Sequence, residues 1–180
     1  MTPNEISLVL ADLRRQGREI YDLTVSNPTA AGFVYPEAAV LAALNHPNNL
    51  QYAPSARGLP AARAALCAYY GRKGFALNPE QIFLTASTSE AYSYLFRLLA
   101  DPGDTVLFPR PSYPLFQFLV DLNDLNMEFY TLRRADGWRL DPAQLAAACG
   151  PRVKALVGVN PNNPTGSYIH PDDRPWLCAL

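Results

Sequence analysis

The sequence of 180 residues lacks any apolar stretch of the roughly 20 residues needed to span a membrane. It also lacks a charge excess, since 15 basic and 16 acidic residues give a formal net charge of -1. A near-neutral net charge argues against electrostatic attraction to nucleic-acid phosphates or anionic lipids. We therefore expect neither a nucleic acid nor a membrane as its partner.

The sequence also contains few cysteines and no recognisable signal peptide. The three cysteines, Cys67, Cys149 and Cys178, are odd in number and widely spaced, which fits neither a disulfide framework nor a metal site. The first residues lack the basic and then apolar run of a signal peptide. These absences predict a cytoplasmic protein with reduced thiols and no metal.

Short apolar runs alternate with helical patterns along most of the chain. Such alternation with short links predicts an α/β fold, a mostly parallel sheet with helices on both faces, preceded by an N-terminal helical and extended segment. Candidates for burial on the helix from residue 60 are Ala64, Leu66, Ala68 and Tyr69. We expect strands at 20–25, 82–85, 105–108, 128–132 and 153–159, and helices at 4–16, 37–45, 60–70, 88–100, 114–124 and 141–150.

The segment Asn160-Pro161-Asn162-Asn163-Pro164-Thr165-Gly166 follows the last of these strands. Proline fixes φ and restricts the residue before it, so the turn is stiff and holds the Asn163 amide at the carboxyl end of a strand. Ligands of open α/β sheets bind at that end, where an amide can donate to a ligand oxygen. Taken alone, the same residues are typical of an ordinary turn.

A second candidate site joins a strand to a helix. Ser87 and Glu90 have the spacing of a capping box, and a helix N-terminus offers free N–H groups to a phosphate. Thr88 and Ser89 add hydroxyl donors. The alternative is a plain helix cap with spare hydroxyls. The loop lacks the G-K-[ST] of a Walker motif, which argues against a nucleoside triphosphate.

A third candidate site is Tyr113, which three prolines flank within residues 109–116. This stiff segment follows a strand, and a planar ligand could stack on the tyrosine ring. The alternative is an ordinary packed loop aromatic. We assign Phe116 and Phe118 to the core.

Together, these sites offer a phosphate cradle, an aromatic face and an amide donor at three strand ends. A flat, phosphorylated ring that carries an oxygen substituent would use all three. Pyridoxal 5'-phosphate (PLP) fits that description, and the protein then has mainly to orient it.

In these segments and in their order, the chain resembles the N-terminal half of a fold type I PLP-dependent aminotransferase of the class I/II, aspartate aminotransferase-like family. The resemblance implies that Asn163 donates to the ring hydroxyl oxygen of PLP and also borders the substrate. It implies that Tyr113 stacks on the ring and that Ser87, Thr88 and Ser89 hold the phosphate. The family more often has glycine in this phosphate loop.

The resemblance also implies roles outside these three segments. Tyr52 matches the tyrosine that reaches the phosphate of a neighbouring subunit, which implies a homodimer; the alternative is a partly exposed loop tyrosine. Ser26 matches a loop over the substrate carboxylate; the alternative is a simple turn. Residues 1–40 would form an N-terminal arm and part of the small domain, and residues 41–180 the first part of the PLP-binding large domain.

The family's Schiff-base lysine, its acid partner for the ring nitrogen and its carboxylate-binding arginine lie beyond the segment that matches Asn163. Only residues 167–180 follow here, and the lysines of the chain, Lys73 and Lys154, lie elsewhere. We therefore expect an apparently truncated chain, a fragment or the product of an interrupted gene. It would supply the cofactor-holding half of transamination between an amino acid and a 2-oxo acid and be inactive alone. Alternatives are a PLP lyase on the same scaffold, or a non-catalytic remnant or PLP-binding module.

Overall fold

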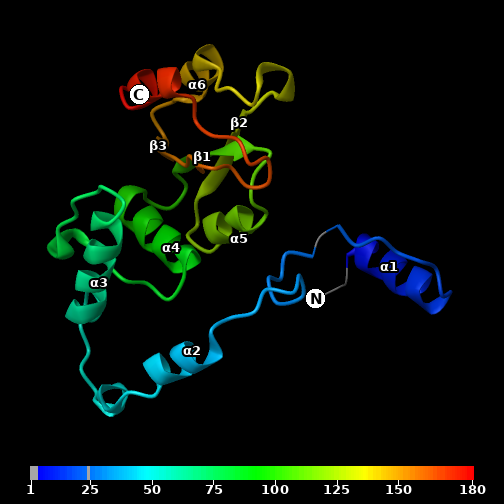
Figure 1. Cartoon of the computed structure of the whole chain (residues 1–180). Coiled ribbons are helices and arrows are strands. Elements are labelled where there is room, and N and C mark those ends of the chain that lie inside the picture. The colour runs from blue at the N-terminus through cyan, green and yellow to red at the C-terminus, as the bar shows by residue number, and fades with distance from the viewer. Residues whose placement is uncertain (1–3, 24) are drawn as a thin grey trace. The chain divides into compact units, whose positions relative to one another are not determined.

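The computed structural model describes residues 4–23 and 25–180 (Figure 1). The chain divides into two compact units, Met1–Ala53 and Pro54–Leu180. The domain boundary expected after residue 40 stays a prediction. Every helix in the described residues falls short of the length and apolar character that crossing a bilayer requires.

The first unit begins with helix α1, Glu5–Arg15. The Asn4 side chain caps it by accepting a hydrogen bond of 2.8 Å from the Ser7 N–H. Gly17 follows with φ of 68°, a left-handed conformation that glycine adopts without steric cost. The helix predicted at 4–16 is thus confirmed to within one residue at each end.

The strand expected at 20–25 is wrong for the residues that the structure describes. Residues 20–23 and 25 belong to no strand, and Thr24 lies outside the described residues. A strand needs a neighbour to pair with, and the described part of this unit offers helices instead: α2, Glu37–Leu44, and a 3₁₀ turn, Pro47–Leu50.

The second unit contains the sheet. Strands β1 (Thr105–Arg110), β2 (Asn126–Thr131) and β3 (Val153–Leu156) are arranged in the order β2-β1-β3, and both pairs are parallel. The predicted α/β class with a mostly parallel sheet is confirmed. Strand β3 ends earlier than the predicted 153–159.

Helices cover both faces of this sheet (Figure 1). Helices α4 (Thr88–Leu99) and α5 (Leu115–Asp121) contribute to the core on one face. Helices α6 (Pro142–Ala148) and α7 (Arg174–Leu177) contribute to the core on the other. Because α5 connects β1 to β2 and α6 connects β2 to β3, the two crossovers lie on opposite faces.

Strand β1 is the centre of both cores, because its side chains alternate between the two faces. Val106 and Phe108 join one hydrophobic cluster and Leu107 joins the other, all three with no exposed surface. Burying a side chain of this size contributes about 1.5–3 kcal/mol. The core prediction for Phe118 is wrong: it is exposed, whereas Phe116, Leu119 and Val120 form the buried face of α5. Phe118 lies two positions from Phe116 and so points away from that face.

Helix α3, Pro60–Gly71, confirms the helix predicted at 60–70 but not its buried face. Its one buried residue is Arg63, whose Nη1 donates to the Pro79 carbonyl at 2.7 Å and to Glu80 Oε1 at 3.1 Å. The helix therefore packs on a polar 3₁₀ turn, Pro79–Gln81, rather than on the apolar core. Leu66 is half-buried, and the other predicted core residues are exposed: Ala64, Ala68 and Tyr69.

The segment at 82–85 is extended but is not the predicted strand, since no strand of the described residues lies beside it to form a ladder. Instead the Leu84 N–H donates to the Arg57 carbonyl at 3.1 Å. Gly58 adjoins this bond with φ of 86°, and a Cβ atom there would lie 2.6 Å from Leu84 Cβ. This close approach places the segment that leads into α4.

An ion pair holds the last elements on the sheet. The Asp173 side chain is buried and accepts hydrogen bonds from Arg139 Nε, at 2.9 Å, and from Arg139 Nη2. These bonds hold the pKa of Asp173 below its ordinary value, although burial opposes the shift. Trp138 and Trp176 pack on the same cluster, so tryptophan fluorescence reports on this region.

We predict that Asp173→Asn lowers the free energy of unfolding by about 1–2 kcal/mol near neutral pH, a value moderated because Arg139 is partly exposed. Since the folded-state pKa lies below the unfolded value of about 3.9, the stabilisation is fully present above that pH. It is lost as pH falls through the folded-state pKa. Urea unfolding across acidic pH, followed by tryptophan fluorescence, tests this. Asp172→Asn, at an exposed neighbour, is the control and should change little. Equal effects of both variants would contradict the prediction.

Candidate functional site

Parallel pairing brings the carboxyl ends of the strands to one edge of the sheet. The chain leaves β1 through residues 111–114 and leaves β3 through residues 157–166. The chain leaves β1 toward α5 on one face of the sheet and leaves β3 toward α7 on the other. The carboxyl ends of these neighbouring strands therefore flank a topological switch point, where open α/β sheets bind ligands.

A pocket of about 320 Å³ lies there, within the range of small-molecule sites. It brings together Thr88, Ser89, Tyr113 and Asn163, four of the six residues predicted to contact the cofactor. Residues from three separate segments therefore meet around one cavity. The remaining lining residues are Tyr92, Phe116, Leu119 and Val159.

The N-terminus of α4 forms one end of the pocket. Ser87 is the predicted N-cap: its Oγ accepts a hydrogen bond of 3.2 Å from the Glu90 N–H, and Glu90 Oε2 accepts one of 2.6 Å from the Ala86 N–H. The Ala86 N–H bond lowers the pKa of Glu90, because it stabilises the ionised carboxylate. Ser87 itself does not line the pocket, whereas Thr88 and Ser89, in the turn with free N–H groups, do.

The aromatic wall of the pocket has a fixed geometry. Tyr113 packs edge-to-face on Phe116, with ring centroids 5.9 Å apart and an interplanar angle of 89°. Phe116 packs edge-to-face on Tyr92 at 5.1 Å, and burial raises the pKa of Tyr92. Tyr113 remains 43 % exposed. A half-exposed ring held from one side suits a stacking platform.

Sequence reasoning did not single out Tyr92 as a site residue. It lies four positions after Thr88 on α4, and residues at that spacing share one helix face. That periodicity was the signal that could have identified it. Val159, also missed, precedes the asparagine-rich loop directly.

The loop that carries Asn163 is closed by its own hydrogen bonds. The Asn162 N–H donates to the Ser167 carbonyl, and the Gly166 N–H donates to the Asn162 carbonyl, both at 2.7 Å. Asn160 Oδ1 accepts a hydrogen bond of 2.9 Å from the Ile169 N–H. Asn163 is exposed at the tip of this closed loop.

Asn162 is buried beneath that tip, with 4 % of its surface exposed. Its Nδ2 donates to the Thr165 hydroxyl at 2.9 Å and to the Pro111 carbonyl at 3.3 Å. The second bond joins the Asn163 loop to the Tyr113 loop. Sequence reasoning missed this residue, because burial of one asparagine among several has no signature in a turn motif.

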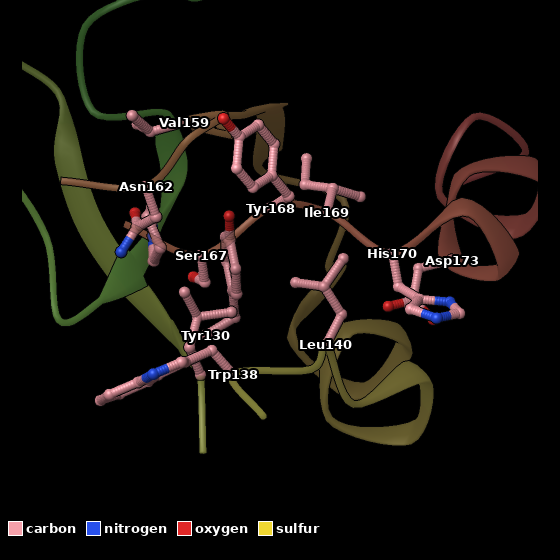
Figure 2. Close-up of a pocket in the computed structure, with 13 residues that line it drawn as sticks. Tyr130, Trp138, Leu140, Val159, Asn162, Ser167, Tyr168, Ile169, His170 and Asp173 are labelled. Atoms are coloured by element: carbon pink, nitrogen blue, oxygen red, sulfur yellow. The ribbon is translucent and has the colours of Figure 1, made fainter. Parts of the chain in front are cut away.

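Figure 2 shows a smaller pocket beside the same loop, lined in part by Tyr130, Asn162, Tyr168 and Asp173. Its volume of about 20 Å³ is near that needed for one water molecule, too little for a cofactor. Tyr130 donates its hydroxyl to the Val157 carbonyl at 2.8 Å, and burial raises the pKa of this tyrosine. This region supports the loop and is not a second cofactor site.

Two more predicted site residues belong to the first unit. Tyr52 is 94 % exposed and, like the exposed Ser26, belongs to the first unit. Their roles remain predictions. The two lysines are exposed: Lys73 Nζ lies 4.4 Å from the ring centroid of Tyr69, and Lys154 Nζ donates to the Pro151 carbonyl at 3.2 Å. Neither lysine lines the 320 Å³ pocket.

Comparison with known proteins identifies the family to which this fold belongs. Residues 18–176 match the model of the family described as aminotransferase class I and II. The chain belongs to this family, and the resemblance inferred from the sequence is confirmed.

Three relatives illustrate the similarity. An alanine aminotransferase of Mycobacterium tuberculosis is 34 % identical over 161 residues, which cover 87 % of this chain and 37 % of the relative. The structure of an alanine aminotransferase from Pyrococcus furiosus is 30 % identical with a TM-score of 0.80, covering 93 % of this chain and 43 % of that one. The structure of a double mutant of Thermus thermophilus aspartate aminotransferase is 32 % identical with a TM-score of 0.79, covering 96 % and 46 %. The chain thus spans less than half the length of each.

We predict that Ser87→Ala lowers the free energy of unfolding by about 1 kcal/mol, because it removes the oxygen that caps α4. Urea unfolding followed by far-ultraviolet circular dichroism measures the change. Ser89→Ala is the matched control, since Ser89 lies inside the helix and caps nothing. Equal stability of Ser87→Ala and the unmodified chain would show that the cap is unimportant.

Proposed function

We propose that this chain holds PLP in the switch-point pocket and serves transamination between an amino acid and a 2-oxo acid. The observation that carries the proposal is the convergence of the α4 N-terminus, the Tyr113 ring and the Asn163 amide around one cavity. Each offers what one part of PLP requires: donors for the phosphate, a face for the ring and a donor for the ring oxygen.

The chemistry of this donor set fits PLP in charge as well as shape. A helix N-terminus favours a phosphate dianion, and the Thr88 and Ser89 hydroxyls add donors without adding charge. Among the described residues, no Lys or Arg lines the pocket, so the helix dipole and neutral donors of this chain would bind the phosphate. Ser87 would contribute through its backbone and through the cap that fixes the helix start.

PLP, when bound, supplies the electron sink that stabilises negative charge at the substrate α-carbon. The residues of this chain bind and orient it. Tyr113, fixed by Phe116, would hold the ring plane, and Asn163 would donate to the ring oxygen and favour its ionised form. Phe116 and Leu119 wall the pocket with apolar surface that limits the access of water.

We extend the proposal to the assembly and substrates by family membership. Tyr52, whose ring is exposed, would reach the phosphate of a second copy in a cytoplasmic homodimer, and Ser26 would border the substrate carboxylate. The relatives bear the names of two amino acids, alanine and aspartate, at nearly equal identity. We therefore propose the reaction class, transamination, and no particular amino acid as the substrate.

Binding of pyridoxine 5'-phosphate tests the pocket, because this analogue has no aldehyde and cannot label lysines. Calorimetry should show one site per chain. Ser87→Asp preserves the helix cap but places a negative charge beside the phosphate, and we predict about tenfold weaker binding. Ala143→Asp adds the same charge at the start of α6, away from the pocket, and should bind normally. Equal affinity of both variants would refute the phosphate site.

The chain by itself should not catalyse transamination, because neither Lys73 nor Lys154 lines the pocket. We predict no formation of pyruvate from alanine and 2-oxoglutarate beyond the rate that PLP gives without the chain. After borohydride reduction with one equivalent of PLP, mass spectrometry should find no site-specific label. An alanine aminotransferase of full length, assayed in parallel, is the positive control. Turnover, or stoichiometric labelling of one lysine, would overturn this expectation.

A further inference from the structure

We propose that Asn162 is a positioning residue that sets the spacing between the Asn163 amide and the Tyr113 ring. The inference rests on the proposed function, since these are the groups that would hold the ring oxygen and the ring face. The sequence motif predicts a role for Asn163, whereas the hydrogen bond between the two loops comes from its neighbour, Asn162.

The loops have no other side-chain hydrogen bond between them in the described residues. Asn162 spans 51 positions of sequence through its Nδ2 bond to the Pro111 carbonyl. Pro111 lies two residues before Tyr113, and Asn163 follows Asn162 directly. One amide group therefore connects to both ring-facing residues through at most two peptide units.

The position requires an amide rather than another side chain of similar size. Both Nδ2 protons are used, one by Pro111 and one by Thr165. Asn162 Oδ1 is buried without a partner, so burial of this oxygen costs free energy that the fold tolerates for the two donated bonds. An aspartate has the same shape but no donors, and it would place a carboxylate against the Pro111 carbonyl.

A positioning role and a stabilising role of Asn162 differ in what its substitution changes: ligand geometry in the first case, the free energy of unfolding in the second. Asn162→Ala removes the two donated bonds and the unpartnered oxygen together, so the removal of that oxygen partly offsets the loss of the bonds in the free energy of unfolding. Its effect on ligand geometry should be large, because no other side-chain hydrogen bond among the described residues then joins the two loops. Asn160→Ala breaks the bond to Ile169 within the same loop and leaves the bond to Pro111 intact, which makes it the matched control.

The experiment uses pyridoxine 5'-phosphate bound to the 180-residue chain, with affinity measured by calorimetry and ring-hydroxyl ionisation by ultraviolet absorption across pH. In the unmodified chain the Asn163 amide should stabilise the ionised ring oxygen and lower the pKa of the bound ring hydroxyl. Asn162→Ala should bind about tenfold more weakly and raise that pKa, as Asn163→Ala does, whereas Asn160→Ala should change neither. Thr165→Val, which removes one of the two acceptors and keeps the volume, should fall between them.

The outcomes distinguish this inference from the proposed function. If the unmodified chain binds no pyridoxine 5'-phosphate, or if Asn163→Ala leaves the pKa of the bound ring hydroxyl unchanged, the proposed cofactor site fails. If Asn163→Ala raises this pKa and Asn162→Ala does not, the positioning role alone fails. If Asn162→Ala does not fold, Asn162→Leu decides, because leucine has a similar shape and removes both donated bonds: an unchanged pKa and affinity in that variant refute the role.

Discussion

The pairing of β1 with both neighbours is the constraint on which the rest of the second unit depends. Parallel strands must return through crossovers, and these crossovers cover the sheet on opposite sides of β1. The same pairing places the exits of β1 and β3 next to each other. The core and the pocket are therefore two consequences of one arrangement, since burial of Leu107 and Phe108 fixes the strand whose exit carries Tyr113.

Local patterns predicted the helices and central strands well, because capping residues, prolines and apolar periodicity act within a few residues. The segments at 20–25 and 82–85 were predicted as strands from composition, and their described residues form no strand. Strand formation depends on a partner elsewhere in the chain, which composition cannot supply. The prediction of the buried face of α3 was wrong for a related reason. Arg63 donates hydrogen bonds to a carbonyl and a carboxylate of a turn that is distant in sequence, and α3 packs on that turn instead of on an apolar partner.

The candidate site likewise contains residues that could be predicted from local sequence and residues that could not. Thr88, Ser89, Tyr113 and Asn163 could be named from the sequence, because each lies in a stiff loop at an expected strand or helix end. Their meeting around one cavity followed from the rule that ligands bind at the carboxyl edge of a parallel sheet. The support for those residues could not be named. Asn162 is hidden in a run of asparagines, and its importance lies in a carbonyl 51 positions away.

Gly58 shows how far the geometry of this site extends along the chain. The absence of a side chain at this position lets the backbone lie against Leu84, a few residues before α4 begins. Any larger residue would have to push the incoming segment outward, and the first turn of the helix would move with it. The turn at Gly58 thus helps to determine where the proposed anion-binding end of α4 lies. Substitutions in this distant turn would therefore change the shape of the pocket, although Gly58 does not line it.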